Sequence, residues 1–212
     1  MKNLKRQRIL NLYCGIGGNR KLWGNKHEIT AVEINPKIAK IYKDFFPEDN
    51  VIVGDAHEYL RANFRNFDFI WASPPCPTHS ELQMTRFYNT DLKYPDMALY
   101  QEIILLKYFY KGNWIVENVN PYYKPLINPA FKIERHLFWS NKFFLTENLN
   151  LGLFDDIRSN IKIMQKKYGF NLNPYKKDLS CFEIRKCLRN CVIPELGKYV
   201  FEKIQVVTDD DK

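Results

Sequence analysis

Short apolar runs alternate along the chain with longer amphipathic segments, a pattern typical of a sheet built from strand–helix units. Residues 35–46 and 97–110 have apolar positions at helical spacing, and Asn35 followed by Pro36 suits a helix N-terminus. We also expect a helix to begin near Asn19. Buried strands are predicted at residues 8–13, 28–34, 50–56, 67–75 and 113–119. The pattern predicts an α/β fold, with an open, mostly parallel sheet and helices on both faces.

Candidate ligand-binding residues follow the first three predicted strands. Gly15, Gly17 and Gly18 come after the first strand, Glu33 closes the second, and Asp55 follows the third. In such a sheet the carboxyl ends of the strands form the ligand-binding edge. The glycines let a ligand approach the backbone, the glutamate can accept from ribose hydroxyls, and the aspartate from an adenine amino group. The G-x-G-x-x-G spacing of nicotinamide sites is absent, so the pattern favours S-adenosylmethionine, which carries no pyrophosphate.

A thiol and a carboxylate end the next two predicted strands. Cys76 follows two prolines after the fourth strand, and Glu117 lies in the fifth. A thiol can attack an electrophilic carbon while a nearby carboxyl group protonates or hydrogen-bonds the ring that receives the charge. A lone cysteine is more often a small buried hydrophobe, which is the alternative interpretation. If the thiol reacts, we expect a positive group or a following helix N-terminus to lower its pKa.

Positive charge is concentrated in one stretch of the chain. The formal net charge is +8, and residues 158–190 hold nine Lys or Arg against two acidic residues. This favours a nucleic-acid partner, with a solvated helical surface as the alternative. No apolar run reaches membrane-spanning length, and the five cysteines lack the spacing of a zinc site or a disulfide framework. We therefore expect a soluble, cytoplasmic protein with no metal site and no membrane partner.

Seven stretches stand in a recognisable order: ILNLYCGIGG, AVEINP, GDA, SPPCPTHS, VENV, ERHLF and LRNCVIPELGKYVFEKI. They resemble the ordered motifs of DNA (cytosine-5)-methyltransferases, most closely the small phage-type members. The resemblance implies a Rossmann-like, S-adenosylmethionine-dependent methyltransferase fold. Residues 1–140 and 188–212 would form the catalytic domain, and residues 141–187 a small, shortened target-recognition lobe.

The resemblance also implies roles for individual residues. Cys76 would add to carbon 6 of a flipped cytosine, Glu117 would hold ring nitrogen 3, and Arg135 would contact the cytosine oxygen. The implied cofactor contacts are Tyr13, Gly15, Gly17, Gly18, Glu33, Ile34, Asp55, Ala56, Pro75, Asn190 and Val192. Residues 77–96 look like the loop that closes on DNA. Together with the basic stretch, this loop gives the expected nucleic-acid contacts Ser80, Arg86, Lys162, Lys166, Lys167, Lys176 and Lys177.

Three positions depart from the family pattern. Asn11 replaces an aspartate, Ile133 stands where another arginine is common, and Arg189 replaces a glycine. We expect a monomer that acts on double-stranded DNA in a bacterial or phage-infected cell, and the short lobe leaves room for a partner protein that supplies sequence recognition. Two alternatives stay open: methylation of cytosine in transfer RNA, and a catalytically silent paralogue that binds DNA. Retention of the thiol and both glutamates speaks against the silent paralogue.

Overall fold

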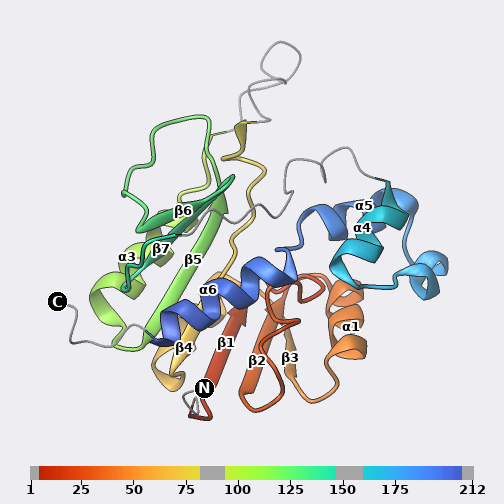
Figure 1. Ribbon diagram of the computed structural model, residues 1–212, viewed down its shortest axis with the longest axis horizontal. Coiled ribbons are helices and arrows are strands. Elements are labelled where there is room, and N and C mark those ends of the chain that lie inside the picture. The colour runs from red at the N-terminus through yellow and green to blue at the C-terminus, as the bar shows by residue number, and fades with distance from the viewer. Residues whose placement is uncertain (1–4, 82–93, 147–159, 207–212) are drawn as a thin grey trace.

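A single seven-stranded sheet forms the centre of the molecule (Figure 1). The computed structural model describes residues 5–81, 94–146 and 160–206. The strands lie in the order β3-β2-β1-β4-β5-β7-β6, and β7 runs antiparallel to both of its neighbours while the other pairs are parallel. Their bounds are β1 (Arg8–Leu12), β2 (Glu28–Glu33), β3 (Asn50–Val53), β4 (Phe69–Ala72), β5 (Asn113–Val119), β6 (Phe131–Ile133) and β7 (His136–Ser140). The predicted mostly parallel sheet is confirmed, and the final hairpin is an addition.

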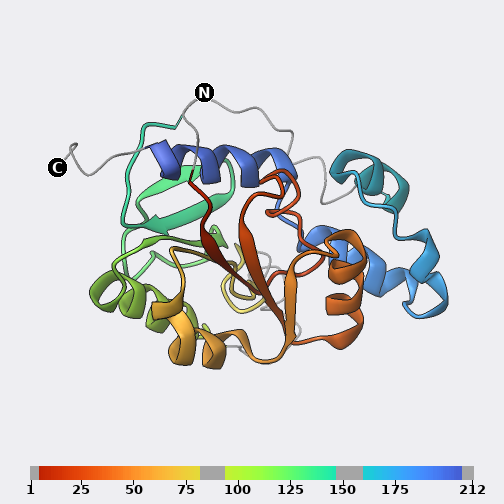
Figure 2. The same cartoon turned by 90° about the horizontal axis from the view of Figure 1, so that it is seen from below.

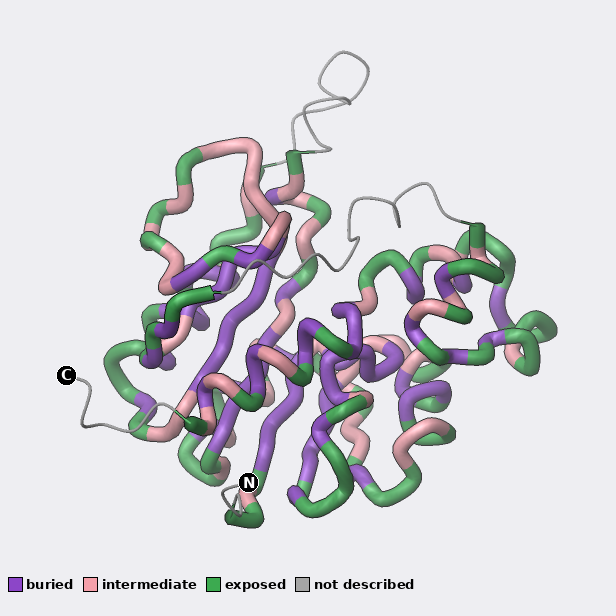
Figure 3. Tube along the Cα trace, viewed as in Figure 1, coloured by how far each residue is buried: buried purple, intermediate pink, exposed green. Residues whose placement is uncertain are grey.

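Helices cover both faces of this sheet, as expected (Figure 2). α2 and α3 pack on one face, whereas α1 and α6 pack on the other. Successive residues of β1 show why: Ile9 belongs to one apolar cluster and Leu10 to the other, and both are fully buried. The central strands are accordingly buried: β4 along its whole length and β1 at every residue after Arg8, whereas the edge strand β3 has no fully buried residue (Figure 3). The helices are α1 (Pro36–Phe45), α2 (Ala56–Asn63), α3 (Ala98–Phe109), α4 (Ile161–Tyr168), α5 (Cys181–Arg189) and α6 (Pro194–Val206), with 3-10 turns η1 (Phe64–Asn66) and η4 (Asn173–Lys177).

The helix expected near Asn19 is absent, and that prediction is wrong. Residues 15–27 form turns and bends. The side chains of this segment point to separate partners: Asn19 pairs with Asn11, and the Trp23 indole donates to the Gly197 carbonyl at 3.2 Å. Its ring stacks on Phe201 of α6 at 4.8 Å. The C-terminal helix therefore covers the sheet where the expected helix would have packed.

The lobe formed by α4, η4 and α5 rests on α1. Phe170 meets the edge of the Phe45 ring at 4.9 Å, the Lys37 ammonium donates to the Asp178 carbonyl at 3.1 Å, and the Tyr175 hydroxyl donates to Asp44 at 2.9 Å. Its buried apolar side chains belong to the same cluster as those beneath α6. The basic stretch is thus packed against the strand–helix unit that carries Glu33.

Among the described residues, no helix has the length and apolar character needed to cross a membrane. Within the same ranges, no three His, Cys, Asp or Glu side chains are grouped as metal ligands.

Candidate active site

The candidate residues meet at one edge of the sheet because β1, β2 and β4 end within one residue of each other and β5 runs beside β4. Leu12 of β1 lies opposite Val32 of β2 and Ala72 of β4, and Ala72 lies opposite Val116 of β5. The strand order reverses between β1 and β4, which is where open α/β sheets bind ligands. The residues that follow these positions therefore share one mouth.

The three glycines of the turn after β1 have different surroundings: two are tightly packed, and one borders open space. A Cβ at Gly17 would lie 2.3 Å from the Phe46 ring, and one at Gly18 would lie 2.2 Å from the Val192 carbonyl oxygen. These two glycines allow close packing, and the second brings the last predicted motif against the turn. A Cβ at Gly15, whose φ is +53°, would have no atom within 4 Å, so this glycine borders open space. That open side is where the backbone can approach a cofactor.

Two backbone N–H groups fix the Glu33 carboxylate and leave it able to accept further hydrogen bonds. Its Oε2 accepts from the Gly15 backbone N–H at 3.1 Å, and its Oε1 accepts from the Asn35 N–H at 2.9 Å. Asn35 in turn caps α1, as the sequence predicted. A carboxylate offers about four acceptor positions, so two remain for other donors. The two hydroxyls of a ribose fit that requirement.

The other predicted cofactor residues surround this carboxylate. Ile34 is 66% exposed, an apolar side chain that an adenine ring can cover. Asp55 caps α2 by accepting from the Glu58 N–H at 3.0 Å, a role that the sequence analysis did not assign, and Ala56 is buried behind it. Pro75 and Asn190 are exposed, while Val192 is buried against the glycine turn.

A polar cluster that was not predicted from the sequence lies beneath Tyr13. The Tyr13 hydroxyl donates to Glu102 of α3, and His57 Nδ1 lies 3.1 Å from the same carboxylate oxygen. Burial raises the pKa of Glu102, and the hydrogen bond to Glu102 raises the pKa of His57. The cluster borders a cavity of about 340 Å³ between α2 and α3. A glutamate inside the apolar run ALYQEIILL was the available signal.

Cys76 lies in a tight turn that the neighbouring strand secures. Its carbonyl accepts from the His79 and Ser80 N–H groups at 3.0 Å, and Asn118 of β5 donates to the Pro74 carbonyl at 3.1 Å. Burial raises the pKa of the Cys76 thiol, the Glu117 carboxylate adds to the rise, and Arg135 opposes it. The expected lowering of this pKa is therefore wrong, because the single guanidinium does not outweigh desolvation and a like charge.

The predicted catalytic side chains come together at this point. Glu117 is buried, and its Oε1 lies 2.5 Å from Nδ1 of His136. Arg135 occupies the two-residue turn between β6 and β7, and its buried Nε has no hydrogen-bond partner in the described part of the chain. Both Glu117 and Arg135 act electrostatically on Cys76. Ile133, in contrast, is buried in the core.

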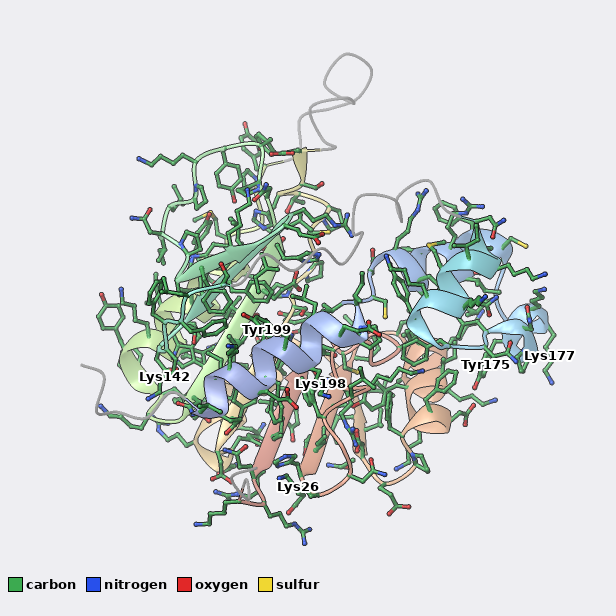
Figure 4. The ribbon with its side chains drawn as sticks, in the orientation of Figure 1. Lys26, Lys142, Tyr175, Lys177, Lys198 and Tyr199 are labelled. Atoms are coloured by element: carbon green, nitrogen blue, oxygen red, sulfur yellow. The ribbon has the colours of Figure 1, made fainter. Side chains whose placement is uncertain are left out.

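The predicted nucleic-acid contacts are spread more widely. Ser80 is half-buried beside Pro121, at the mouth, and Arg86 lies outside the described residues. Lys162 and Lys166 are exposed on α4, Lys167 there is half-buried, and Lys176 and Lys177 are exposed in η4. Figure 4 places Lys177 at the outer end of the lobe, away from β4 and β5. The structure does not bring the η4 lysines to the Cys76 edge.

Comparison with known proteins identifies the family of this chain. The sequence model described as "C-5 cytosine-specific DNA methylase" matches residues 7–125, more than half of the chain. The chain belongs to this family.

Among its relatives, a "tRNA (cytosine(38)-C(5))-methyltransferase" of Spodoptera frugiperda is 39% identical over 75 residues, which are 32% of this chain and 23% of that protein. The chain thus spans about a quarter of that relative's length. A solved DNMT2 mutant of the same organism is 29% identical, covering 53% of this chain and 35% of that one at a TM-score of 0.37.

The Entamoeba histolytica methyltransferase EhMeth aligns over 98% of this chain and 99% of its own, with a TM-score of 0.56 and 14% identity. This similarity confirms the Rossmann-like methyltransferase fold. S-adenosylmethionine is the cofactor of this C-5 cytosine methylase family member. The half-engaged Glu33 carboxylate and the open side of Gly15 fit its adenosine portion.

Proposed function

We propose that this chain methylates carbon 5 of cytosine in DNA and that Cys76 is its nucleophile. The observation that carries the proposal is the convergence of Cys76, Glu117 and Arg135 at the ends of β4, β5 and the β6–β7 turn. This group shares one edge of the sheet with Glu33, which suits the ribose. The nucleophile and the methyl donor can therefore reach the same cytosine ring.

Cys76, Glu117 and Arg135 have separate roles in this reaction. A cytosine stacked in a duplex is out of reach, so the base must turn out into the mouth, where the turn after Pro75 fixes the Cys76 sulfur. The sulfur bonds to carbon 6, and the π electrons of carbons 5 and 6 move into the ring. Glu117 would face ring nitrogen 3, while Arg135 Nε, which has no hydrogen-bond partner among the described residues, suits the carbonyl oxygen of cytosine. Carbon 5, made nucleophilic by this addition, takes the methyl group that the cofactor would supply. Loss of the carbon 5 proton to solvent then re-forms the double bond between carbons 5 and 6 and expels the thiolate.

The bound cofactor supplies an electrophilic methyl group. Around it, Glu33 would accept from the ribose hydroxyls, and Asp55 from the adenine amino group. Tyr13, the other two glycines of the turn and the segment 190–192 would close the site. Because burial raises the pKa of Cys76, the thiol must give up its proton as its sulfur bonds to carbon 6.

Residues 141–187 form, in this proposal, a reduced target-recognition region on a catalytic domain of residues 1–140 and 188–212. A region of this size presents few side chains to base edges, and each bidentate base contact discriminates by roughly 1–3 kcal/mol. We therefore propose a recognition site of about two to four base pairs, or a partner protein that extends it. Phosphate contacts would come from the lysines of α4 and η4.

One experiment tests the activity and the substrate together. The purified protein is incubated with radiolabelled S-adenosylmethionine and either duplex DNA or transfer RNA, and the product is digested to nucleosides. We expect label in 5-methyldeoxycytidine, with none when Cys76→Ser replaces the wild type. Label in a purine, or methylation that survives Cys76→Ser, would overturn the proposal.

Transfer RNA is the second candidate substrate, because the named relative with 39% identity acts on cytosine in tRNA. The Cys76 and Glu117 chemistry is the same for either polymer, so these residues do not separate them. Label found in 5-methylcytidine and absent from 5-methyldeoxycytidine in the same experiment would assign RNA as the substrate.

A further inference from the structure

Glu117 contacts a second buried titratable side chain, for which the reaction above has no use. His136 is the first residue of β7, and its Nδ1 lies 2.5 Å from Glu117 Oε1. Both side chains are 7% exposed. A contact of this length between a carboxyl group and an imidazole is a short hydrogen bond, which becomes charge-assisted when the carboxyl group is ionised.

The ladder between β5 and β7 imposes this contact. Glu117 lies opposite Phe138, and Val119 lies opposite His136, so the two titratable side chains are diagonal neighbours on one face of the sheet. The turn before β7 has Glu134 at φ +50°, which sets the start of the strand. The pair is therefore positioned by backbone pairing on both sides.

Each side chain of the pair has a second polar atom that does not take part in this contact. His136 engages Oε1 of Glu117, and within the described ranges neither Oε2 of the glutamate nor Nε2 of the histidine makes a hydrogen bond. The carboxyl group can thus present Oε2 to a substrate while Oε1 stays attached to the imidazole. The free Nε2 offers the pair a point of proton exchange with solvent.

Ring nitrogen 3 of a neutral cytosine is an acceptor, so Glu117 can hydrogen-bond it only when Oε2 carries a proton. We propose that His136 is a positioning residue that fixes Glu117 and stabilises the charge left when this proton moves. The inference rests on the proposed function and deepens it. As the Cys76 sulfur bonds to carbon 6, the π electrons of carbons 5 and 6 shift toward nitrogen 3, which takes the proton from Oε2. The resulting carboxylate accepts from Nδ1–H of His136, and elimination of Cys76 returns the proton to Oε2.

Two further groups that carry or can acquire charge lie near the pair. Arg135, from the adjoining turn, is a fixed cation, and Cys76, from the end of β4, must lose its proton to react. Ile133 is packed in the core and supplies no donor. Rising pH should therefore favour adduct formation through the thiol, whose pKa is raised by burial.

Adduct formation with 5-fluorocytosine tests this role, since fluorine at carbon 5 blocks the elimination step. The probes are a duplex DNA pool and a tRNA transcript, each containing 5-fluorocytosine, with S-adenosylmethionine present. His136→Leu should slow adduct formation by roughly 10- to 100-fold, the loss expected for one charge-assisted hydrogen bond. His136→Asn, a neutral donor, should restore part of the rate. Lys132→Gln, exposed on the same hairpin, is the matched control.

The outcomes separate three explanations. A His136→Asn variant that forms the adduct no faster than His136→Leu would overturn the inference, as would a parallel loss of S-adenosylhomocysteine binding, which indicates general structural damage. If the wild type forms an adduct with neither polymer, the proposed function itself fails.

A measurement without substrate tests the pair independently. The chain has four histidines, so NMR of labelled imidazoles can follow each one. Glu117→Gln should shift the titration and tautomer signals of His136 and leave those of His27 unchanged. Unaltered His136 signals would overturn the inference.

Discussion

Gly15 offers the sharpest test of where the cofactor binds, because a second glycine provides a matched control. Both Gly15, at φ +53°, and Gly24, at φ +78°, have a left-handed backbone and no atom within 4 Å of an added Cβ. Gly15 adjoins Glu33 at the carboxyl ends of the strands, whereas Gly24 is exposed in the turn that leads to β2. Alanine at either position imposes the same backbone strain, but only one added methyl group lies beside the proposed adenosine position.

The magnitudes follow from that geometry. A left-handed conformation costs a residue other than glycine about 1–2 kcal/mol. The smaller freedom of alanine in the unfolded chain offsets about 0.4–1 kcal/mol of this. Each variant should therefore lose about 1 kcal/mol of unfolding free energy, or roughly 2–4 °C in Tm for a chain of this length. Crowding of the bound cofactor adds about 1–3 kcal/mol for Gly15→Ala alone, which weakens binding by roughly 5- to 150-fold.

Isothermal titration with S-adenosylhomocysteine, together with thermal unfolding, measures both quantities. We expect equal losses of stability, weak binding by Gly15→Ala and unchanged binding by Gly24→Ala. Equal affinities in the two variants would show that the open space beside Gly15 is not the cofactor site.

Three further predictions concern titration and charge. The pKa values of Glu102 and His57 are both raised in the folded chain, so folding takes up protons. The contribution of this pair to the free energy of unfolding should therefore be largest at low pH and fall as pH rises through the two raised pKa values. Glu102→Gln should flatten this dependence in urea titrations, and plots of unfolding free energy against pH that run parallel for the variant and the wild type would contradict the prediction. Because burial raises the pKa of Cys76, adduct formation with 5-fluorocytosine DNA should accelerate as pH increases from neutral, and an adduct formed by Cys76→Ser on denaturing gels would assign the chemistry to another thiol. Glutamine at the five lysines of α4 and η4 should weaken binding to all duplexes alike and flatten its salt dependence in fluorescence anisotropy; an unchanged salt slope would place the phosphate contacts elsewhere. These lysines are Lys162, Lys166, Lys167, Lys176 and Lys177.

The sequence determined the elements that depend on local pattern. Continuous apolar runs gave the five parallel strands to within a few residues, and β5 matches its predicted range of 113–119. Asn35 and Pro36 located the start of α1, since a cap and a first-turn proline act within one helical turn. The ends of these strands also identified Glu33, Cys76 and Glu117 as candidates, because parallel strands deliver their carboxyl ends to one edge.

Tertiary structure decided what depends on partners distant in the chain. Residues 19–23 have a helical composition, yet Trp23 packs on α6, about 170 positions later in the chain. The sequence likewise did not determine the direction of the Cys76 pKa shift. Burial and Glu117 raise this pKa and Arg135 lowers it, and the net direction depends on how these groups lie around the thiol in the folded chain. His136 had no sequence signal, because its contact with Glu117 arises only from the antiparallel register of β5 and β7. Local spacing carries information about strands and caps, whereas side-chain pairing across the sheet is fixed only when the strands align.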